Sequence, residues 1–392
     1  MQMHLNLCYR GGVNIRFAPT ALMLGNIVIG CSVMAPAGML NELSDSLDVS
    51  IRAAGLLITF GAVVLCVGSP VTAWLTGRIE RRALLTATLA VLAITNLASA
   101  FAPNYATLLV IRLIMLGVGV IYTPQAAGTA ALIVPAEKLG STIAYVFLGW
   151  SLAAAVGLPL ITFAASRYGW QAAYAGIGIG GILSFLLLAW RLPGKLYAAP
   201  VALRTWIDLG RNRLIILLLA ITVLQMSGQF IIFTFMGPLL KQLTGASADA
   251  IGLIFALYGG FGFVGIVIAT RIVDSWGAYR TSVLFTSLLF AGVAGWAFGA
   301  GVYALMACGV VSWGLGFAST NSMQQVRLVA AAPPLAPASV ALNTSVLYIG
   351  QAIGSFVGGV FYARDLLHGQ GFAGAAFVAV ALALVIASRP GK

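Results

Sequence analysis

The sequence predicts an all-α membrane protein with twelve transmembrane helices arranged in two six-helix halves. Of its 392 residues, 61% are hydrophobic and only 8% are charged, and the mean hydropathy is +1.02. Soluble chains carry about 25% charged residues, so most of this surface must face lipid. In addition, apolar runs of the roughly 20 residues that a spanning helix needs recur along the whole chain.

Twelve apolar runs can be marked in chain order. They lie near residues 18–42, 53–76, 83–101, 106–134, 141–165, 172–190, 214–240, 250–272, 281–299, 302–328, 339–363 and 372–388. Each run is continuously apolar, whereas the strands of a membrane β-barrel alternate in polarity over about ten residues. The runs are therefore interpreted as helices.

The basic residues are distributed unequally between the two sides of these spans. Sixteen of the 21 Lys and Arg residues flank the spans on the side of the N-terminus, four flank them on the other side, and Arg112 lies within a span. Basic loops remain in the cytoplasm, so both termini are expected there, in a bacterial inner membrane. This topology accounts for the net charge of +12, and no nucleic-acid partner is expected.

The longest loop separates the spans into two sets of six. The expected domains are an N-terminal bundle of residues 1–190, a cytoplasmic linker of residues 191–213 and a C-terminal bundle of residues 214–392. The four cysteines form no CxxC pair and are interpreted as small apolar residues. Neither a metal site nor a cofactor is expected.

Two loops at equivalent places in the halves carry charged motifs. One reads Arg271-Ile-Val-Asp274-Ser-Trp-Gly277-Ala-Tyr-Arg280, and the other reads Gly77-Arg78-Ile-Glu80-Arg81-Arg82. A carboxylate there can bond the N-terminus of a neighbouring helix and pair with Arg. The motifs predict a cytoplasmic gate made of Arg78, Glu80, Arg81, Arg82, Arg271, Asp274, Gly277 and Arg280. Simple anchoring by positive charge is the alternative.

The loop after the eighth span resembles the signature of the major facilitator superfamily, in which an Asp, a Gly and a basic residue follow an even-numbered span. In the loop after the second span, Gly77 replaces the family Asp and Glu80 replaces its Gly. The fifth span carries Gly149, Gly157 and Pro159 in a pattern similar to the antiporter signature of the drug:proton antiporter branch, although Leu158 separates the last two.

The segment from Gln324 to Gly359 looks like the arabinose-efflux-permease-like subgroup of that family. The resemblance implies alternating access around a site between two six-helix bundles. It also implies export of a small polar or amphiphilic solute, such as a sugar, nucleoside or drug, coupled to protons. The expected partners are this solute, the lipid bilayer and protons, and the protein is expected to act as a monomer.

Polar residues inside the spans are the candidate solute-binding groups, because the resembled fold lines its cavity with spans 1, 4, 7 and 10. The candidates are Asn26, Arg112, Gln225, Gln229, Asn321, Gln324, Gln325, Tyr348 and Gln351. Hydrogen bonds that hold the bundle together are the alternative role. Arg112 is the most costly of them in lipid. It is expected to point into the bundle, toward spans 1, 2 or 5. Its expected partners are backbone carbonyls, Asn or Gln amides, cavity water or an anionic solute.

Two further patterns lead to predictions. Gly350, Gly354 and Gly358 recur every four residues and would let another helix approach closely. All nine acidic residues lie in loops or at span ends, so no carboxylate is available in mid-membrane. A proton relay in lipid is usually built from Asp, Glu or His. Glu42 and Asp45, at the outer end of the first span, are the nearest candidates for proton coupling.

Several alternatives to proton-coupled export remain open. The missing mid-membrane acid favours an importer or an uncoupled facilitator of a small metabolite, whereas the antiporter-like fifth span opposes it. An intramembrane enzyme would need a buried Asp pair, a Ser–His pair or metal ligands, and none is visible in the sequence. The chain is therefore not expected to be an enzyme. A channel or a receptor is the remaining possibility.

Overall fold

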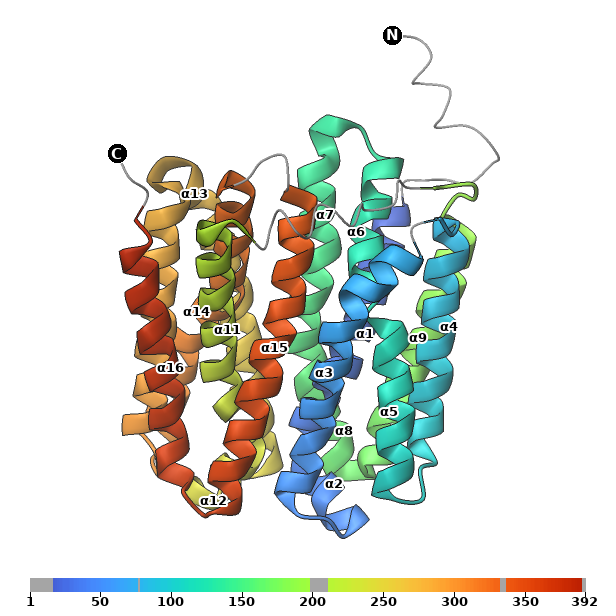
Figure 1. The fold of residues 1–392 in the computed structure, drawn as a ribbon. Helices are drawn as coiled ribbons and strands as arrows, with labels where there is room; N and C mark the ends of the chain where they lie inside the picture. The colour runs from blue at the N-terminus through green and yellow to red at the C-terminus, as the bar shows by residue number, and fades with distance from the viewer. Residues whose placement is uncertain (1–16, 77, 198–210, 332–335, 390–392) are drawn as a thin grey trace.

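Helices dominate the computed structural model, which describes residues 17–76, 78–197, 211–331 and 336–389 (Figure 1). Twelve of its helical segments are long and apolar enough to cross a membrane, which confirms the predicted number of spans. They form two six-span halves that lie side by side. The loop residues 198–210, at the centre of the expected linker, fall outside the described ranges.

The helices are numbered in chain order in both halves. The N-terminal half contains α1 (Ala18–Gly38), α2 (Leu40–Leu47), α3 (Ile51–Leu75), α4 (Arg81–Ala100), α5 (Tyr105–Gly119), α6 (Tyr122–Ile133), α7 (Ala136–Leu152), the π-helical turn η3 (Ala153–Gly157), α8 (Leu158–Tyr168) and α9 (Trp170–Arg191). The C-terminal half contains α11 (Arg213–Phe233), α12 (Met236–Thr244), α13 (Ala248–Phe298), α14 (Tyr303–Ala331), α15 (Ala336–Ala363) and α16 (Leu367–Ala387).

Local sequence explains where several helices begin and turn. The side chains of Ser50, Asn104 and Ser247 accept hydrogen bonds from the backbone N–H groups three residues later and so cap α3, α5 and α13. Helix α13 contains two spans that meet at Gly277, where φ is +79° and ψ is 153°. A positive φ favours glycine, which explains this residue at the turn between the eighth and ninth spans.

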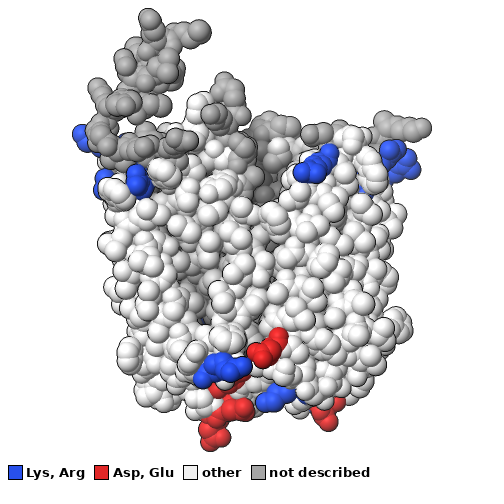
Figure 2. Space-filling view, turned by 180° about the vertical axis from the view of Figure 1, so that it is seen from behind, with Lys and Arg blue, Asp and Glu red and all other residues white. Residues whose placement is uncertain are grey.

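The two ends of the bundle differ in charge. Helix α1 begins and α16 ends at the same end, which we call the basic end and which carries Arg78, Arg82, Arg191, Lys195, Arg280 and Arg389. At the opposite end, which we call the acidic end, lie Glu42, Asp45, Asp48, Asp249 and Asp365. In Figure 2, the acidic residues in view are all at this end, while the charged residues in view at the basic end are all Lys or Arg. Between the ends the surface is apolar, as a lipid-facing surface must be.

Small residues let helices pack closely within each half. A Cβ added at Gly350, Gly354 or Gly358 of α15 would lie 2.6, 2.3 or 2.3 Å from a backbone carbonyl oxygen of α11. Real Cβ atoms do not approach a carbonyl oxygen so closely, and these oxygens belong to helix backbone that cannot shift cheaply. The predicted role of this glycine strip in close helix packing is confirmed.

We expect Gly354→Ala to destabilise the protein by about 1–3 kcal/mol, because the added methyl group would force α15 away from α11. The melting temperature in detergent is the measurement. The control is Gly180→Ala on α9, where an added Cβ meets nothing within 4 Å. That variant should melt at the wild-type temperature or above it, since alanine favours helix. Equal melting temperatures for the two variants would contradict the packing role.

Candidate functional site

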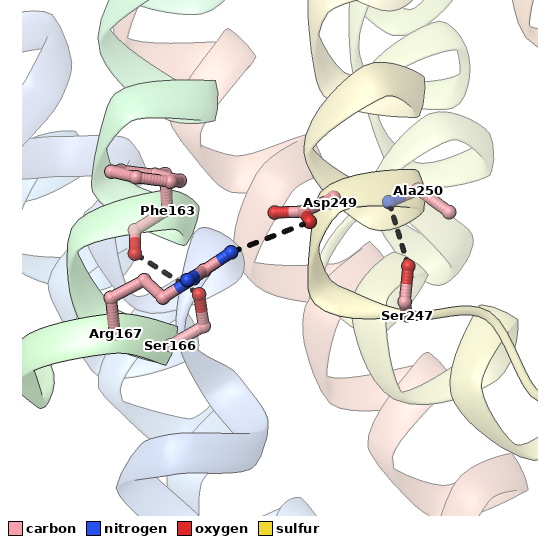
Figure 3. Close-up of polar contacts among 6 residues, drawn as sticks. All are labelled: Phe163, Ser166, Arg167, Ser247, Asp249 and Ala250. Carbon is pink, nitrogen blue, oxygen red and sulfur yellow. Dashed lines mark hydrogen bonds and ion pairs between the residues drawn. The ribbon is translucent and has the colours of Figure 1, made fainter.

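The two halves are joined toward the acidic end by contacts that we call the seam. Thr59 on α3 donates a hydrogen bond of 2.9 Å to Ser355 on α15. Arg167 on α8 lies 3.9 Å from the carboxylate of Asp249 on α13, and both side chains are exposed (Figure 3). Nearby, a Cβ added at Gly55 would lie 2.6 Å from the ring of Phe235 in the other half. These contacts hold the halves together at the acidic end.

The antiporter-like segment of the fifth span takes part in the seam through its backbone. The π-helical turn η3 lies within the motif and ends at Gly157, directly before α8, whose second residue is Pro159. A Cβ added at Gly259 of α13 would lie 2.3 Å from the backbone nitrogen of Ala155. Gly149 and Gly157 meet α1 equally closely, at Met23 and Cys31. This span is therefore packed between α1 of its own half and α13 of the other.

Uncommitted polar groups of the C-terminal half lie on α15 beside the seam. Gln351 is one helical turn before Ser355 and Tyr348 is two turns before it, so all three lie on the helix face that meets α3. Tyr348 and Gln351 are close to the middle of α15, and both are largely buried. Within the described residues neither side chain makes a hydrogen bond, so both have polar atoms available for a solute.

A second polar cluster lies near mid-membrane in the N-terminal half. Trp150 donates to the hydroxyl of Thr123 at 3.2 Å, and Thr123 donates to the side-chain oxygen of Asn26 at 2.8 Å. Asn26 donates in turn to the carbonyl of Val146 and is fully buried. Trp150 and Thr123 are half-buried. Trp150 lies one helical turn before Ala154, and Ala154 contacts Gly259 of the other half. Asn26 therefore ties helices together, while Trp150 and Thr123 remain partly exposed beside the seam.

Other predicted candidates are committed to bonds within the C-terminal half. Gln225 donates to Thr286 at 2.9 Å. Gln229 donates to the carbonyl of Gln225 and accepts a hydrogen bond of 2.9 Å from Trp313. The side chains of Gln225, Gln229 and Gln324 are all buried. Gln324 donates to the carbonyl of Leu218 and accepts from Arg327. These contacts fit the alternative role of holding the bundle together.

Two candidates on α14 retain exposure. Asn321 is half-buried, and its side-chain oxygen accepts a hydrogen bond of 3.0 Å from Asn343. Its amide nitrogen makes no hydrogen bond to the described residues and can donate to a solute. Gln325 is half-buried, and its side chain likewise makes no hydrogen bond to them. Both lie closer to the basic end of the bundle than Gln351 does.

Arg112 points into the bundle, as predicted, and contacts spans 1 and 2. Its guanidinium donates to the carbonyl oxygens of Ser32 and Val33 on α1, at 2.9 and 2.8 Å, and to that of Leu57 on α3, at 2.8 Å. The side chain is 1% exposed. Three backbone carbonyls from two helices thus take the place of a carboxylate as partners of this charge. This geometry favours the structural role over contact with a solute.

The residues of the predicted gate hold parts of the N-terminal half together. Glu80 caps α4 by accepting from Ala83 N–H at 2.8 Å, and its other oxygen accepts from Lys195 N–H at 2.9 Å. Arg81 donates to Gln125 and Arg82 donates to the carbonyl of Ala189. Three gate residues, Arg78, Arg271 and Arg280, are exposed. The side chain of Asp274 is outside the described part of the structure, so its proposed latch stays a prediction.

Glu42 is a half-buried acid of the seam. It lies on α2, outside the spans, at the acidic end. Burial raises the pKa of its carboxyl, and a backbone hydrogen bond and the nearby Lys241 on α12 partly offset this, while Asp45 adds to it. Lys241 belongs to the other half, so the charge state of Glu42 is linked to the contact between halves. Asp45 is exposed.

Several residues beside the seam were not singled out from the sequence. Trp150 stands inside the antiporter-like motif, of which only Gly149, Gly157 and Pro159 were singled out. Thr59, Thr123 and Ser355 are small hydroxyl residues that occur in many helices, and their partners lie far away in the sequence. Spacing from a recognised motif could have found Trp150, but no sequence signal marks the hydroxyls.

We expect Arg112→Ala and Arg112→Lys to lower stability by about 2–4 kcal/mol, because carbonyl contacts to a buried charged donor are lost and a point charge does not reproduce the planar fork. Melting temperature and solute affinity should be measured on the same purified variants. Exposed Arg213→Ala is the matched control and should melt like wild type. Full stability combined with lost affinity would instead establish a solute-binding role.

Comparison with known proteins identifies the family. The model of the Major Facilitator Superfamily matches residues 22–359. The chain is 29% identical to the inner membrane transport protein YdhP of Escherichia coli, covering 96% of this chain and 97% of that protein. It is 26% identical to a probable sugar efflux transporter of Mannheimia succiniciproducens, covering 93% and 92%.

A solved structure with the same fold is that of a D-xylose-proton symporter. It superposes with a TM-score of 0.75 at 16% identity and covers 96% of this chain and 98% of that one. The family match, the twelve spans and the two packed halves agree with one another. The chain is a membrane transporter, not an enzyme, and it belongs to the Major Facilitator Superfamily.

Proposed function

We propose that this transporter exports a small, neutral polar or amphiphilic solute, such as a sugar, nucleoside or drug, by alternating access. The observation that carries the proposal is the set of polar and aromatic side chains beside the seam in mid-membrane. Thr123 and Trp150 come from one half, and Tyr348 and Gln351 come from the other. Ligand sites commonly combine aromatic walls with a few polar groups that fix orientation. The similarity to a probable sugar efflux transporter supports this solute class.

The positive-inside rule supports an orientation with the basic end in the cytoplasm of a bacterium and both termini there. In that orientation the seam closes the outer side, and a solute would enter the site from the cytoplasm. Parting of the seam, with closure at the basic end, would then release it outside. We further propose that a single chain carries out this cycle in the inner membrane.

Exchange for protons is the coupling that the antiporter-like fifth span favours. Glu42 is the proposed proton-responsive group, because its carboxyl is half-buried against the other half of the protein. An uncoupled facilitator or importer is the second candidate. The observation that favours it is the position of Asp249 and the other described acids at span ends and in loops, so the described residues place no carboxylate in mid-membrane.

Transport in inverted membrane vesicles distinguishes these functions. A panel of radiolabelled sugars, nucleosides and drugs would be tested with and without a pH gradient. The proposal expects accumulation of a member of one class that collapses when the gradient is dissipated. Equilibration at the same rate with and without the gradient would establish the facilitator instead.

Once a solute is known, we expect Gln351→Ala and Tyr348→Phe each to weaken its binding about fivefold to tenfold, since each removes one hydrogen-bonding group. Calorimetry on the purified protein would measure the affinity. Gln229→Ala is the matched control, because it removes the same amide from a residue already bonded to Trp313. It should lower the melting temperature and leave the affinity unchanged. Loss of affinity in Gln229→Ala, with unchanged affinity in the two α15 variants, would place the binding site at α11 instead.

We expect low pH to favour the joined seam through Glu42. Burial raises the pKa of this carboxyl in the joined state. Parting of the seam would solvate the group and lower that pKa, so protons bind the joined state more tightly. Spin labels at Gln171 and Arg364, with the native cysteines replaced, would report the separation of the halves as pH falls.

Glu42→Gln mimics the protonated carboxyl and should remain joined at every pH. Asp48→Asn removes a nearby exposed acid and should respond to pH as wild type does. A pH response in Glu42→Gln as large as that of wild type would show that another group senses the proton.

A further inference from the structure

An open pocket lies at the basic end of the N-terminal half, away from the seam. Its volume is about 520 Å³. It is formed by the start of α4 and the segment that follows α9. Its lining residues are Glu80, Arg82, Ala83, Thr86, Gly194, Lys195 and Tyr197.

Hydrogen bonds hold the segment after α9 against α4, so the pocket has a defined shape. Glu80 accepts from the N–H groups of both Ala83 and Lys195. Arg81 N–H donates to the carbonyl of Leu196 at 2.9 Å. Lys195 adopts a φ of +63°, which is uncommon for a residue with a Cβ and is maintained by these bonds. The pocket therefore has a fixed wall that carries the Lys195 side chain.

The charges in the pocket fit an anion. Arg82 and Lys195 contribute two cations, and within the described residues neither forms an ion pair. The one acid, Glu80, has each carboxylate oxygen bonded to a backbone N–H. The guanidinium of Arg82 bonds the carbonyl of Ala189, which leaves other donors of its fork available. Tyr197, which also lines the pocket, carries a hydroxyl that can donate a hydrogen bond.

The surface next to the pocket is apolar and faces lipid. Along α9, Leu183, Leu186 and Trp190 are 63%, 55% and 65% exposed, and Ile94 on the adjoining α4 is 65% exposed. The guanidinium of Arg191 lies 3.7 Å from the centroid of the Trp190 ring. Exposed Trp and Tyr residues mark the level of the lipid headgroups. The pocket thus lies where a headgroup would be, with a path for acyl chains beside it.

From this arrangement we infer that the pocket binds the phosphate of an anionic phospholipid in the leaflet at the basic end. Arg82 and Lys195 neutralise the phosphodiester, Tyr197 donates to the headgroup, and the acyl chains lie along α4 and α9. Basic pockets between membrane helices have the chemistry that selects such lipids. The inference does not depend on which solute is transported.

Native mass spectrometry of the full chain in detergent provides the test, with titration of phosphatidylglycerol and, separately, phosphatidylcholine. We expect the anionic lipid to bind at least fivefold more tightly. Lys195→Asn should weaken phosphatidylglycerol binding about fivefold, the usual contribution of one surface cation. Asparagine is chosen because it tolerates positive φ. Arg82→Gln should weaken binding similarly.

Arg389→Gln is the matched control, because it removes one exposed charge at the same end of the other half. It should leave the affinity unchanged. Inorganic phosphate and glycerol phosphate, which lack acyl chains, should not displace the lipid at millimolar concentration. Displacement by either would make the pocket a site for soluble anions and overturn the lipid assignment. Equal losses in Lys195→Asn and Arg389→Gln, or equal affinity for the two lipids, would overturn the site itself.

Discussion

Lipid offers no hydrogen-bond partners, so a polar group that enters a span is costly unless it is paired inside the protein. Arg112 meets this demand with three backbone carbonyls from α1 and α3. Asn26 and Gln229 meet it with side-chain and backbone partners in their own halves. Among the described residues Tyr348 and Gln351, near the middle of α15, make no such bonds, so they are candidate binding groups. A solute or cavity water would then complete their hydrogen bonding.

The polar contacts within a half and those between halves differ in strength. Within a half, α15 approaches the carbonyls of α11 through its glycine strip, and buried side chains bridge helices. Across the seam, the exposed Arg167–Asp249 pair at 3.9 Å contributes at most about 1 kcal/mol, and Thr59–Ser355 is a single neutral hydrogen bond. These polar contacts would be lost at low cost if the halves separated, whereas the close packing of Gly259 on the backbone of Ala155 is as tight as that of the glycine strip within a half.

Features that depend on local sequence could be predicted well. The twelve spans follow from hydropathy, and the glycine strip of α15 follows from a spacing of four. The roles of polar side chains could not be predicted in the same way, because they depend on partners distant in sequence. Gln225 and Gln351 look alike in the sequence, but among the described residues only the first bonds a hydroxyl, that of Thr286.

Glu80 shows the same limit within a family motif. Its substitution for the family glycine is visible in the sequence, which placed it in the predicted gate. Its bond to Lys195 N–H, 115 residues away in the chain, became visible only when α4 and the segment after α9 were placed together. A motif position alone thus gave the residue's neighbourhood but not its partner.

The partners of Arg112 have a consequence for how the chain is made. Ser32, Val33 and Leu57 all precede Arg112 in the sequence, and membrane proteins are synthesised from the N-terminus. When the ribosome delivers the fourth span to the bilayer, the helices that carry its acceptors have already been inserted. The guanidinium can therefore bind these carbonyls as soon as the fourth span leaves the translocation site. A circular permutant that begins between α3 and α4 would reverse this order, and the span that carries Arg112 would have to enter lipid with its charge still unsatisfied.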